Sequence, residues 1–299
     1  MPSVRDLRDR IRSLKNTQQI TKAMKQVAGA KIRRAEIAQK QARPYADTLA
    51  EMLQDLMRAV ARVDHPFTKP GKAGAPGGIV LMTADKGLAG AFNSNVVRAA
   101  EVYARERGDV VFYTVGVKAR NAIRRLGILD RPSWPLGAAS KLETAREVAR
   151  RVTDDFVSGA ISDVVLVSSK MISMMSQKPE TRKLIPIEPD ALGLPAAGAV
   201  SDAAPSMVAA SRGAVEFSPS PEFVLSRLLP KYLEFTIYSA MLETDAAFFA
   251  AQLVAMSNAT DNATKLIDEL TIQMNNARQA AITKELLEIV AGAEALGVE

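Results

Sequence analysis

Apolar residues recur in alternating steps of four and three along the C-terminal part of the chain. A seven-residue repeat of this kind places one apolar stripe along a helix and predicts a left-handed coiled coil with a partner helix. After a slip of one residue, the repeat resumes close to the C-terminus. The first series is Phe249, Leu253, Met256, Thr260, Ala263, Ile267, Leu270, Met274, Ala277 and Ala281, and the second is Ile282, Leu286, Ile289, Ala293 and Leu296.

A similar repeat occupies the N-terminal part of the chain. Ser3 lies three residues before Asp6, which predicts a helix N-cap followed by an acidic first turn. Pro44 lies inside the repeat and predicts a kink or a break near Arg43. The repeat comprises Leu7, Ile11, Leu14, Ile20, Met24, Val27, Ala35, Ala38, Ala42, Tyr45, Leu49, Met52, Leu56 and Val60.

The two repeats predict one coiled-coil helix over residues 1–63 and another over 222–299, the second becoming regular only after Pro230. Because the segment between them returns the chain, the simplest pairing of these helices is antiparallel and intramolecular. Together they would form one shaft. The alternative is that each helix pairs with another protein.

Between the repeats, short apolar runs alternate with amphipathic stretches. Continuous apolar runs are typical of buried parallel strands, and their alternation with helices predicts a doubly wound, Rossmann-like α/β domain over 77–217. Within it, 189–207 is expected to be a mobile loop and 214–217 an edge strand. The other expected strands are 79–83, 110–115, 163–168 and 184–187, and the expected helices are 91–107, 117–126 and 141–157.

Composition narrows the class of protein. The chain is 47% hydrophobic and 24% charged, which is typical of folded proteins. It contains no cysteine, which excludes disulfides and thiolate metal sites. Its single histidine, His65, is expected to be a solvated loop residue, which argues against a multi-histidine zinc site. No membrane span or signal segment is predicted, so we expect a cytoplasm-like compartment.

Positive charge is concentrated in the first predicted helix. Residues 1–46 hold twelve Lys and Arg and only three Asp and Glu, whereas the whole chain has a net charge of +6. Such an excess favours nucleic acid, anionic lipid or an acidic protein surface as a partner.

The turn after the first predicted strand is where a dinucleotide would bind in a doubly wound fold. Its sequence, Asp85 to Gly90, matches neither the G-x-G-x-x-G fingerprint nor a Walker A loop. We interpret Gly87 and Gly90 as a tight turn that Asp85 caps.

Two pairs of adjacent carboxylates offer no catalytic arrangement. Asp154–Asp155 and Asp268–Glu269 each lie within a predicted helix, where neighbours point in different directions, so we interpret them as solvated. We therefore expect no catalytic residue, no metal site and no cofactor.

Several stretches resemble the gamma subunit of F-type ATP synthases of the bacterial type. The Asp85–Leu88 turn resembles the family's motif after its first strand, and 177–179 resembles a further family stretch. The main matches are ITKAMK at 20–25, AKIRRA at 30–35, ATDNA at 259–263 and NARQAAITKEL at 276–286, followed by EIVAGA at 288–293.

The resemblance implies a non-catalytic central stalk of an H⁺-transporting ATP synthase. The coil would enter a ring of three alpha and three beta subunits, and the α/β domain would sit on the ring of c subunits beside epsilon. Ion flow would turn the c ring and the shaft, which would drive ATP synthesis or hydrolysis by asymmetric contact. The subunit would be peripheral, on the cytoplasmic face of the inner membrane, with membrane contact only through the c ring.

The resemblance also implies which residues contact the ring. At Gln252 many family members carry an arginine, so this contact departs from the usual pattern. From Leu286 onward the helix is apolar or small nearly all round, which favours burial in a surrounding collar. An over-hydrophobic helix end or an oligomer contact is the alternative. The implied ring contacts are Met24, Lys25, Gln252, Arg278, Gln279, Thr283, Glu288, Ile289 and Val290.

Two rival hypotheses stay open from the residues alone. A nucleic-acid-binding coiled coil would use the basic N-terminal helix, and its binding would fall steeply with salt. A nucleotide-dependent enzyme would use the α/β domain and would show measurable nucleotide affinity.

Overall fold

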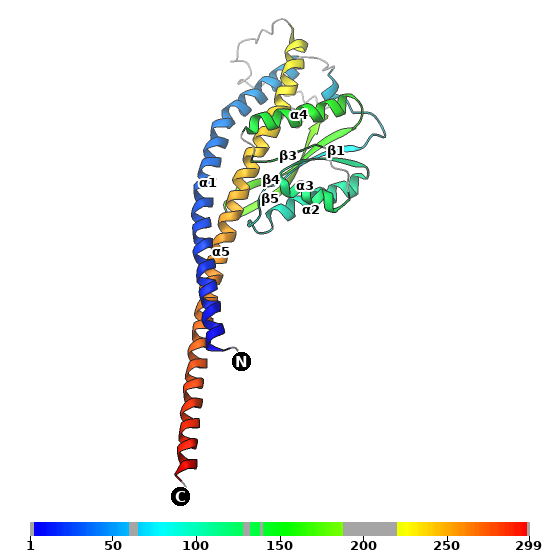
Figure 1. The fold of residues 1–299 in the computed structure, drawn as a ribbon. Coiled ribbons are helices and arrows are strands. Elements are labelled where there is room, and N and C mark those ends of the chain that lie inside the picture. The colour runs from blue at the N-terminus through cyan, green and yellow to red at the C-terminus, as the bar shows by residue number, and fades with distance from the viewer. Residues whose placement is uncertain (1–2, 60–64, 128–131, 138–139, 188–219, 298–299) are drawn as a thin grey trace, which may run out of the picture. The chain divides into compact units, whose positions relative to one another are not determined.

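A computed structural model describes residues 3–59, 65–127, 132–137, 140–187 and 220–297 (Figure 1). The chain divides into two compact units. The first unit combines 1–30 with 252–299, and the second unit is 31–251. Both long helices, α1 (Val4–Ala59) and α5 (Pro221–Leu296), contribute residues to each unit.

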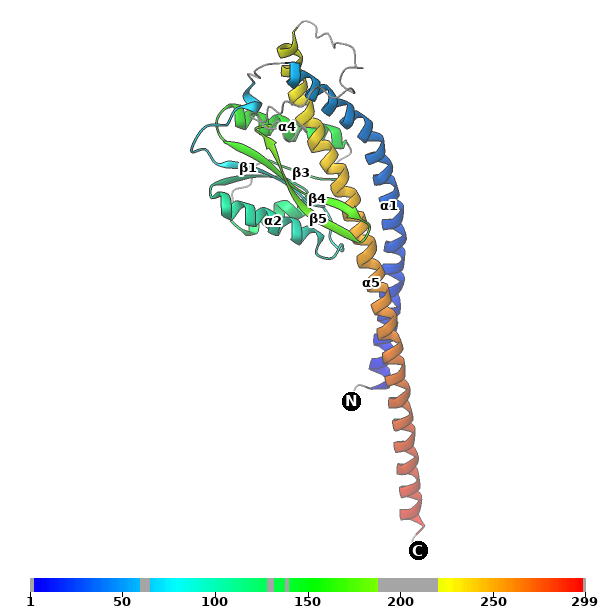
Figure 2. The same cartoon turned by 180° about the vertical axis from the view of Figure 1, so that it is seen from behind.

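In the first unit, α1 and α5 lie antiparallel (Figure 2). The amide of Gln18 donates to the hydroxyl of Thr264 over 2.7 Å, and the Lys25 ammonium donates to the hydroxyl of Ser257 over 2.9 Å. Partner numbers in α5 fall as numbers in α1 rise, which is the signature of an antiparallel pair. The predicted intramolecular pairing is confirmed.

The seam between these helices follows the predicted repeat on α5, where Met256, Ala263 and Ile267 are buried. On α1 the prediction is wrong at Ile20 and Val27, which are 60% and 54% exposed. Farther along α1, in the second unit, the predicted positions Tyr45 and Met52 are also exposed, at 54% and 47%. The heptad register set by Leu7, Ile11 and Leu14 continues instead through Gln18, Thr21, Lys25 and Ala28.

Three predictions concern the N-terminus of α1 and the prolines inside the two long helices. Ser3 and Asp6 exchange two hydrogen bonds of 3.2 Å, each side chain accepting from the other's backbone N–H, which confirms the N-cap. Of the kink or break predicted near Arg43, the break is wrong, because α1 continues through Pro44. The late start of α5 is also wrong, because the helix begins at Pro221 and continues through Pro230.

Packing explains why α5 tolerates an internal proline. Leu229 and Leu233, on either side of Pro230, are 0% and 1% exposed. A proline removes one backbone hydrogen bond from a helix interior. The apolar side chains buried around it hold the helix against that loss.

The second unit contains a five-stranded sheet in the order β3-β2-β1-β4-β5. β1 pairs in parallel with both β2 and β4, and β2 pairs in parallel with β3. β5 is antiparallel to β4 and forms one edge. The strands are β1 (Gly77–Met82), β2 (Val110–Val115), β3 (Ser133–Trp134), β4 (Asp163–Ser173) and β5 (Ser176–Ile185).

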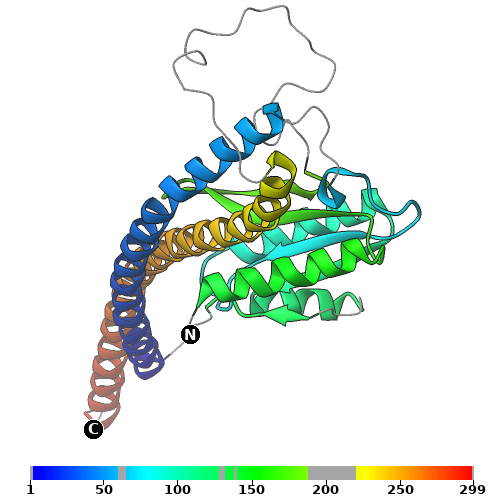
Figure 3. The ribbon, with the colours of Figure 1, turned by 90° about the horizontal axis from the view of Figure 1, so that it is seen from above.

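Helices cover both faces of this sheet, as Figures 1 and 2 show. On one face, α2 (Phe92–Arg107) and α3 (Val117–Arg125) pack on Ile79 and Leu81. On the other, α4 (Lys141–Val157) and residues 225–241 of α5 pack on Val80 and Met82 (Figure 3). The predicted doubly wound α/β fold is therefore confirmed, with a mixed rather than a purely parallel sheet.

The last strand differs most from its prediction. Only Leu184 and Ile185 of the strand expected at 184–187 belong to a strand, the end of β5, which begins at Ser176 and follows β4 through a hairpin. Most of β5 is polar and exposed, as befits an edge strand, so it carries no apolar run. The loop predicted at 189–207 and the strand predicted at 214–217 lie outside the described residues.

Candidate functional site

Residues 278–292 of α5 are exposed on every side of the helix. Seam residues before them, up to Ala277, are at least half-buried. The register of the hydrogen bonds to α1 places Val4, the first residue of α1, opposite about Arg278. Beyond that point α1 has ended, so α5 continues as a single helix.

This exposed segment is apolar, which is unusual for a surface helix. Leu287 and Ile289 are 64% and 67% exposed, although they lie on different sides of the helix. Basic residues are absent from its last turn. Further exposed apolar side chains of the segment are Ile282, Leu286 and Val290. An apolar surface that surrounds a helix marks a place where other protein covers it.

Polar side chains on the same segment bond only along the helix in the described part of the chain. The hydroxyl of Thr283 donates to the carbonyl of Gln279 over 2.9 Å. The Lys284 ammonium lies 3.5 Å from the Glu288 carboxylate, and both side chains are largely exposed. Six of the implied contact residues lie here: Arg278, Gln279, Thr283, Glu288, Ile289 and Val290.

The other three implied contact residues lie in the paired part of the first unit. Met24 and Gln252 are half-buried, and Lys25 is exposed but hydrogen-bonded to Ser257 on α5. These three residues are therefore partly engaged within the coil, whereas the other six are free of α1.

The sequence interpretation missed three polar layers in the coil. Thr260 donates a 2.8 Å hydrogen bond to Thr21, which is only 8% exposed. Gln18 with Thr264 and Lys25 with Ser257 form the layers on either side. The spacing of the sequence could have revealed these layers, because the α1 positions continue the heptad of Leu7, Ile11 and Leu14. The prediction instead followed the next apolar residue, Ile20, which lies outside that register.

At the carboxyl edge of the sheet, Asp85 does not cap its own turn, which corrects the prediction. Its carboxylate accepts hydrogen bonds from the backbone N–H groups of Val117 at 2.9 Å, Leu136 at 3.2 Å and Gly137 at 2.7 Å. The turn is held instead by Asn93, which accepts from the N–H of Ala84 and donates to the carbonyl of Lys86.

One predicted solvated pair contains a buried carboxylate. Asp155 is 7% exposed and accepts a 2.6 Å hydrogen bond from the hydroxyl of Tyr113 on β2. Arg151, one helical turn earlier, donates to the same carboxylate over 3.2 Å. Asp155 is therefore paired within the core, because the turn of α4 that carries it faces the sheet. Asp268 and Glu269 are exposed, as expected.

Two acidic side chains of α5 in the second unit are perturbed by burial. Burial raises the pKa of Asp245, opposed by the Lys141 ammonium 2.7 Å away. Burial also raises the pKa of Glu243, and the nearby charge of Glu180 raises it further. The nearby charge of Asp85 also raises the pKa of Asp245.

His65 caps a short helix instead of being a solvated loop residue. Its Nδ1 accepts from the N–H of Phe67 over 3.1 Å at the start of the 3₁₀ helix η1 (Pro66–Thr68). Burial lowers the pKa of this imidazole.

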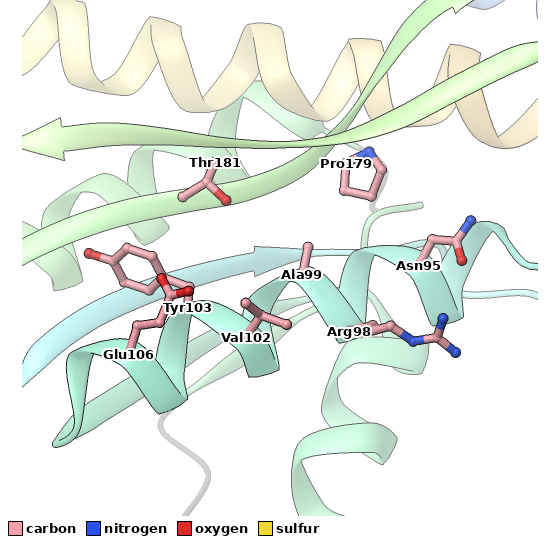
Figure 4. A pocket seen from close by; sticks show the side chains of 8 residues that line it. All are labelled: Asn95, Arg98, Ala99, Val102, Tyr103, Glu106, Pro179 and Thr181. Atoms are coloured by element: carbon pink, nitrogen blue, oxygen red, sulfur yellow. The ribbon is translucent and has the colours of Figure 1, made fainter.

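A groove of about 600 Å³ lies between α2 and β5 (Figure 4). Tyr103 and Glu106 lie at one end of it and Asn95 and Arg98 at the other, with apolar side chains between them. It presents no convergent pair of acid–base groups. Among the described residues, no cluster of potential ligands could hold a metal ion, and no helix combines the length and apolar character that a membrane crossing requires.

Comparison with known proteins places the chain in a family. A family model described as ATP synthase matches residues 3–296. The ATP synthase gamma chain of Heliobacterium modesticaldum is 42% identical over 298 residues, covering 99% of this chain and 100% of the relative. That of Pelotomaculum thermopropionicum is 43% identical over 303 residues, with the same two coverages.

Solved structures share the fold. A chain of the rotational state 3 structure of the Euglena gracilis mitochondrial ATP synthase matches with a TM-score of 0.65 at 19% identity, covering 98% of this chain and 94% of that one. A chain of the central stalk and c ring of the Tetrahymena thermophila mitochondrial ATP synthase matches with a TM-score of 0.58 at 23% identity, covering 80% and 99%. Since the relatives at about 40% identity match along the full length, this chain belongs to the ATP synthase gamma-chain family.

Proposed function

We propose that this chain is the central-stalk subunit of an F-type ATP synthase, the shaft that couples rotation of a c ring to ATP synthesis or hydrolysis. The observation that carries the proposal is the exposed apolar end of α5, with Leu287 and Ile289 uncovered on different sides. A surrounding collar of alpha and beta subunits would bury this segment. Apolar contacts lack the directional bonds that would hold one angle, so the helix could turn within such a collar.

The mechanism is allosteric. A shaft without threefold symmetry presents a different face to each of three beta subunits, and its contacts favour a different conformation in each. Rotation then moves every beta subunit in turn through states of different nucleotide affinity. The shaft itself forms and breaks no covalent bond.

Individual contacts are part of this proposal. Arg278 and Gln279 would engage a loop of beta, with Thr283 and Glu288 in the same cluster. Ile289 and Val290 would lie in the apolar collar. Met24, Lys25 and Gln252 would contact the ring lower on the coil. Helices over 1–63 and 222–299 would act as the shaft, and the 77–217 domain would meet the c ring and epsilon.

The proposed location follows from the partners. A subunit that meets the membrane only through a c ring is peripheral, and in a bacterium the alpha and beta ring faces the cytoplasm. We therefore place this chain at the cytoplasmic face of the inner membrane.

The test is reconstitution. The chain would be mixed with the alpha and beta subunits of the same synthase, the complex purified by size, and ATP hydrolysis measured. We expect one copy of this chain per ring and a higher turnover than the ring alone. A truncation after Lys284 should still assemble through the paired coil but should stimulate hydrolysis less. The matched control is Val157→Ser, at an apolar position of α4 that is 60% exposed but lies in the second unit.

Failure to assemble, or an unchanged turnover, would contradict the shaft function. The nucleic-acid alternative would then be examined by a salt titration against DNA, because residues 1–46 hold the positive excess.

A further inference from the structure

The carboxyl ends of three parallel strands converge on one side chain. Asp85 follows β1, and its carboxylate accepts from Val117, which follows β2, and from Leu136 and Gly137, which follow β3. The donors are separated from Asp85 by 32, 51 and 52 residues along the chain. No turn or local cap accounts for bonds across such separations.

The same segment supplies the missing cap of α3. Gly116 precedes α3 and has no side chain, and the first three N–H groups of the helix find acceptors elsewhere. Val117 donates to Asp85, Lys118 to the carbonyl of Ala84, and Ala119 to the hydroxyl of Thr83. The segment 83–85 therefore satisfies the start of a helix that begins beyond the next strand.

The donors form a nest for an oxyanion. In doubly wound sheets, ligand phosphates bind outside the carboxyl ends of the strands and accept from backbone N–H groups at a helix N-terminus. Here the first N–H group of α3, from Val117, and the N–H groups of Leu136 and Gly137 point at the same position. Gly137 leaves the necessary space, because a Cβ at that position would lie 3.0 Å from Oδ2 of Asp85.

We propose that Asp85 is an internal ligand: its carboxylate holds the oxyanion position of this sheet, closes it to phosphate, and positions Leu136 and Gly137, which precede α4 in the sequence. Helix α4 in turn contacts α5, because Lys141, its first residue, bonds to Asp245 over 2.7 Å. Asp85 is thus a positioning residue for the contact between α4 and α5 inside the second unit. This assignment goes beyond the shaft function and does not depend on it.

The test is chemical rescue of Asp85→Ala in the full chain. Removing the carboxylate leaves three N–H groups without their acceptor, so we expect the unfolding midpoint in sodium chloride to fall by about 5 °C. Inorganic phosphate or sulfate at equal ionic strength should recover part of that loss by entering the vacated position. Because phosphate and sulfate stabilise folded proteins in general, the rise of the midpoint in the unaltered chain is the baseline, and the recovery is the additional rise that Asp85→Ala shows over it.

The double variant Asp85→Ala/Gly137→Ala is the matched control. Its extra methyl group would occupy the space beside the former Oδ2, so the phosphate-specific recovery should disappear. Recovery that persists in the double variant, or a folded Asp85→Ala chain that ignores phosphate, would overturn the proposal.

A second variant keeps the test decisive if Asp85→Ala does not fold. Asp85→Asn retains the shape but turns an NH₂ group toward one of the N–H donors. The backbone amide protons of Val117 and Gly137 should then shift toward the values of weaker hydrogen bonds in NMR spectra. Unchanged shifts at both residues would show that the carboxylate is not their ligand.

Discussion

The hydroxyl of Thr260 donates to the hydroxyl of Thr21 over 2.8 Å across the seam between α5 and α1. Apolar side chains fill most seams of this kind, and a polar pair at a core position fixes register at some loss of stability. Because polar layers with Gln18 and Lys25 flank this one, sliding either helix would break all three hydrogen bonds and move the buried Thr21 hydroxyl away from its partner on α5. A shaft that transmits torque needs such a fixed register.

The hydroxyl pair should therefore show strong coupling. Thr260→Val removes the donor and should lower the free energy of unfolding by about 1 kcal/mol. Thr21→Val should cost less, because the Thr260 hydroxyl keeps its 2.7 Å hydrogen bond to the carbonyl of Met256, and the double variant should cost less than the sum of the two single variants. A double-mutant cycle in urea measures this. Thr17→Val, at an exposed position of α1, is the control. Single effects that simply add would rule out the pair.

Substitutions at exposed apolar residues of α5 should lower ATP hydrolysis without lowering stability, whereas a substitution at a buried apolar residue should lower stability. Leu286→Ser with Ile289→Ser should leave the unfolding of the isolated chain unchanged within about 0.5 kcal/mol, because these side chains are 57% and 67% exposed. Stimulation of ATP hydrolysis in the reconstituted ring should fall several-fold. Met256→Ala, at a position only 5% exposed, should instead cost about 2–5 kcal/mol of stability. Equal hydrolysis by the double variant would argue against an apolar collar.

Local signals predicted some elements closely. Helix α4 occupies 141–157 as expected, because Ser140 caps it and apolar residues at helical spacing face the sheet. All of edge strand β5 before Leu184 escaped prediction, because its residues there are nearly all polar. The role of Asp85 could not be predicted, since its partners lie after two other strands and are backbone N–H groups that any residue carries.

The candidate site divides in the same way. The apolar end of α5 is legible in the sequence, because Leu287 and Val290 lie off the heptad seam. Whether this end of α5 is exposed depends on which α5 residue lies opposite the first residue of α1. Only the register of the coil determines that pairing. Ile20 and Val27 are exposed because polar residues such as Thr21 occupy the seam positions of this part of α1. A search for periodic apolar residues does not detect polar pairs in a seam.

His65 should make stability depend on pH. Burial lowers the pKa of its imidazole below the ordinary 6.5, and Nδ1 must be unprotonated to accept from Phe67. Its contribution is complete above pH 6.5 and is lost as pH falls from there toward the lowered folded-state pKa, because the unfolded chain binds the proton first. Thermal midpoints of the unaltered chain and of His65→Asn, which keeps a capping oxygen, measure it. Because the chain has one histidine, parallel pH curves would contradict this assignment.

Gly116 should tolerate substitution less well than Gly90. Its φ is +102°, and a Cβ would lie 2.1 Å from the carbonyl oxygen of Thr83. Thr83 belongs to the segment 83–85 that caps α3. Gly116→Ala should therefore cost about 4 kcal/mol, measured by urea unfolding. Gly90 also has a positive φ, +58°, but a Cβ there would meet nothing within 4 Å. Gly90→Ala should cost only about 1 kcal/mol, the backbone penalty alone. Similar losses of stability for the two variants would mean that the close approach of Gly116 to Thr83 contributes little to stability. The capping of α3 by 83–85 would then contribute little as well.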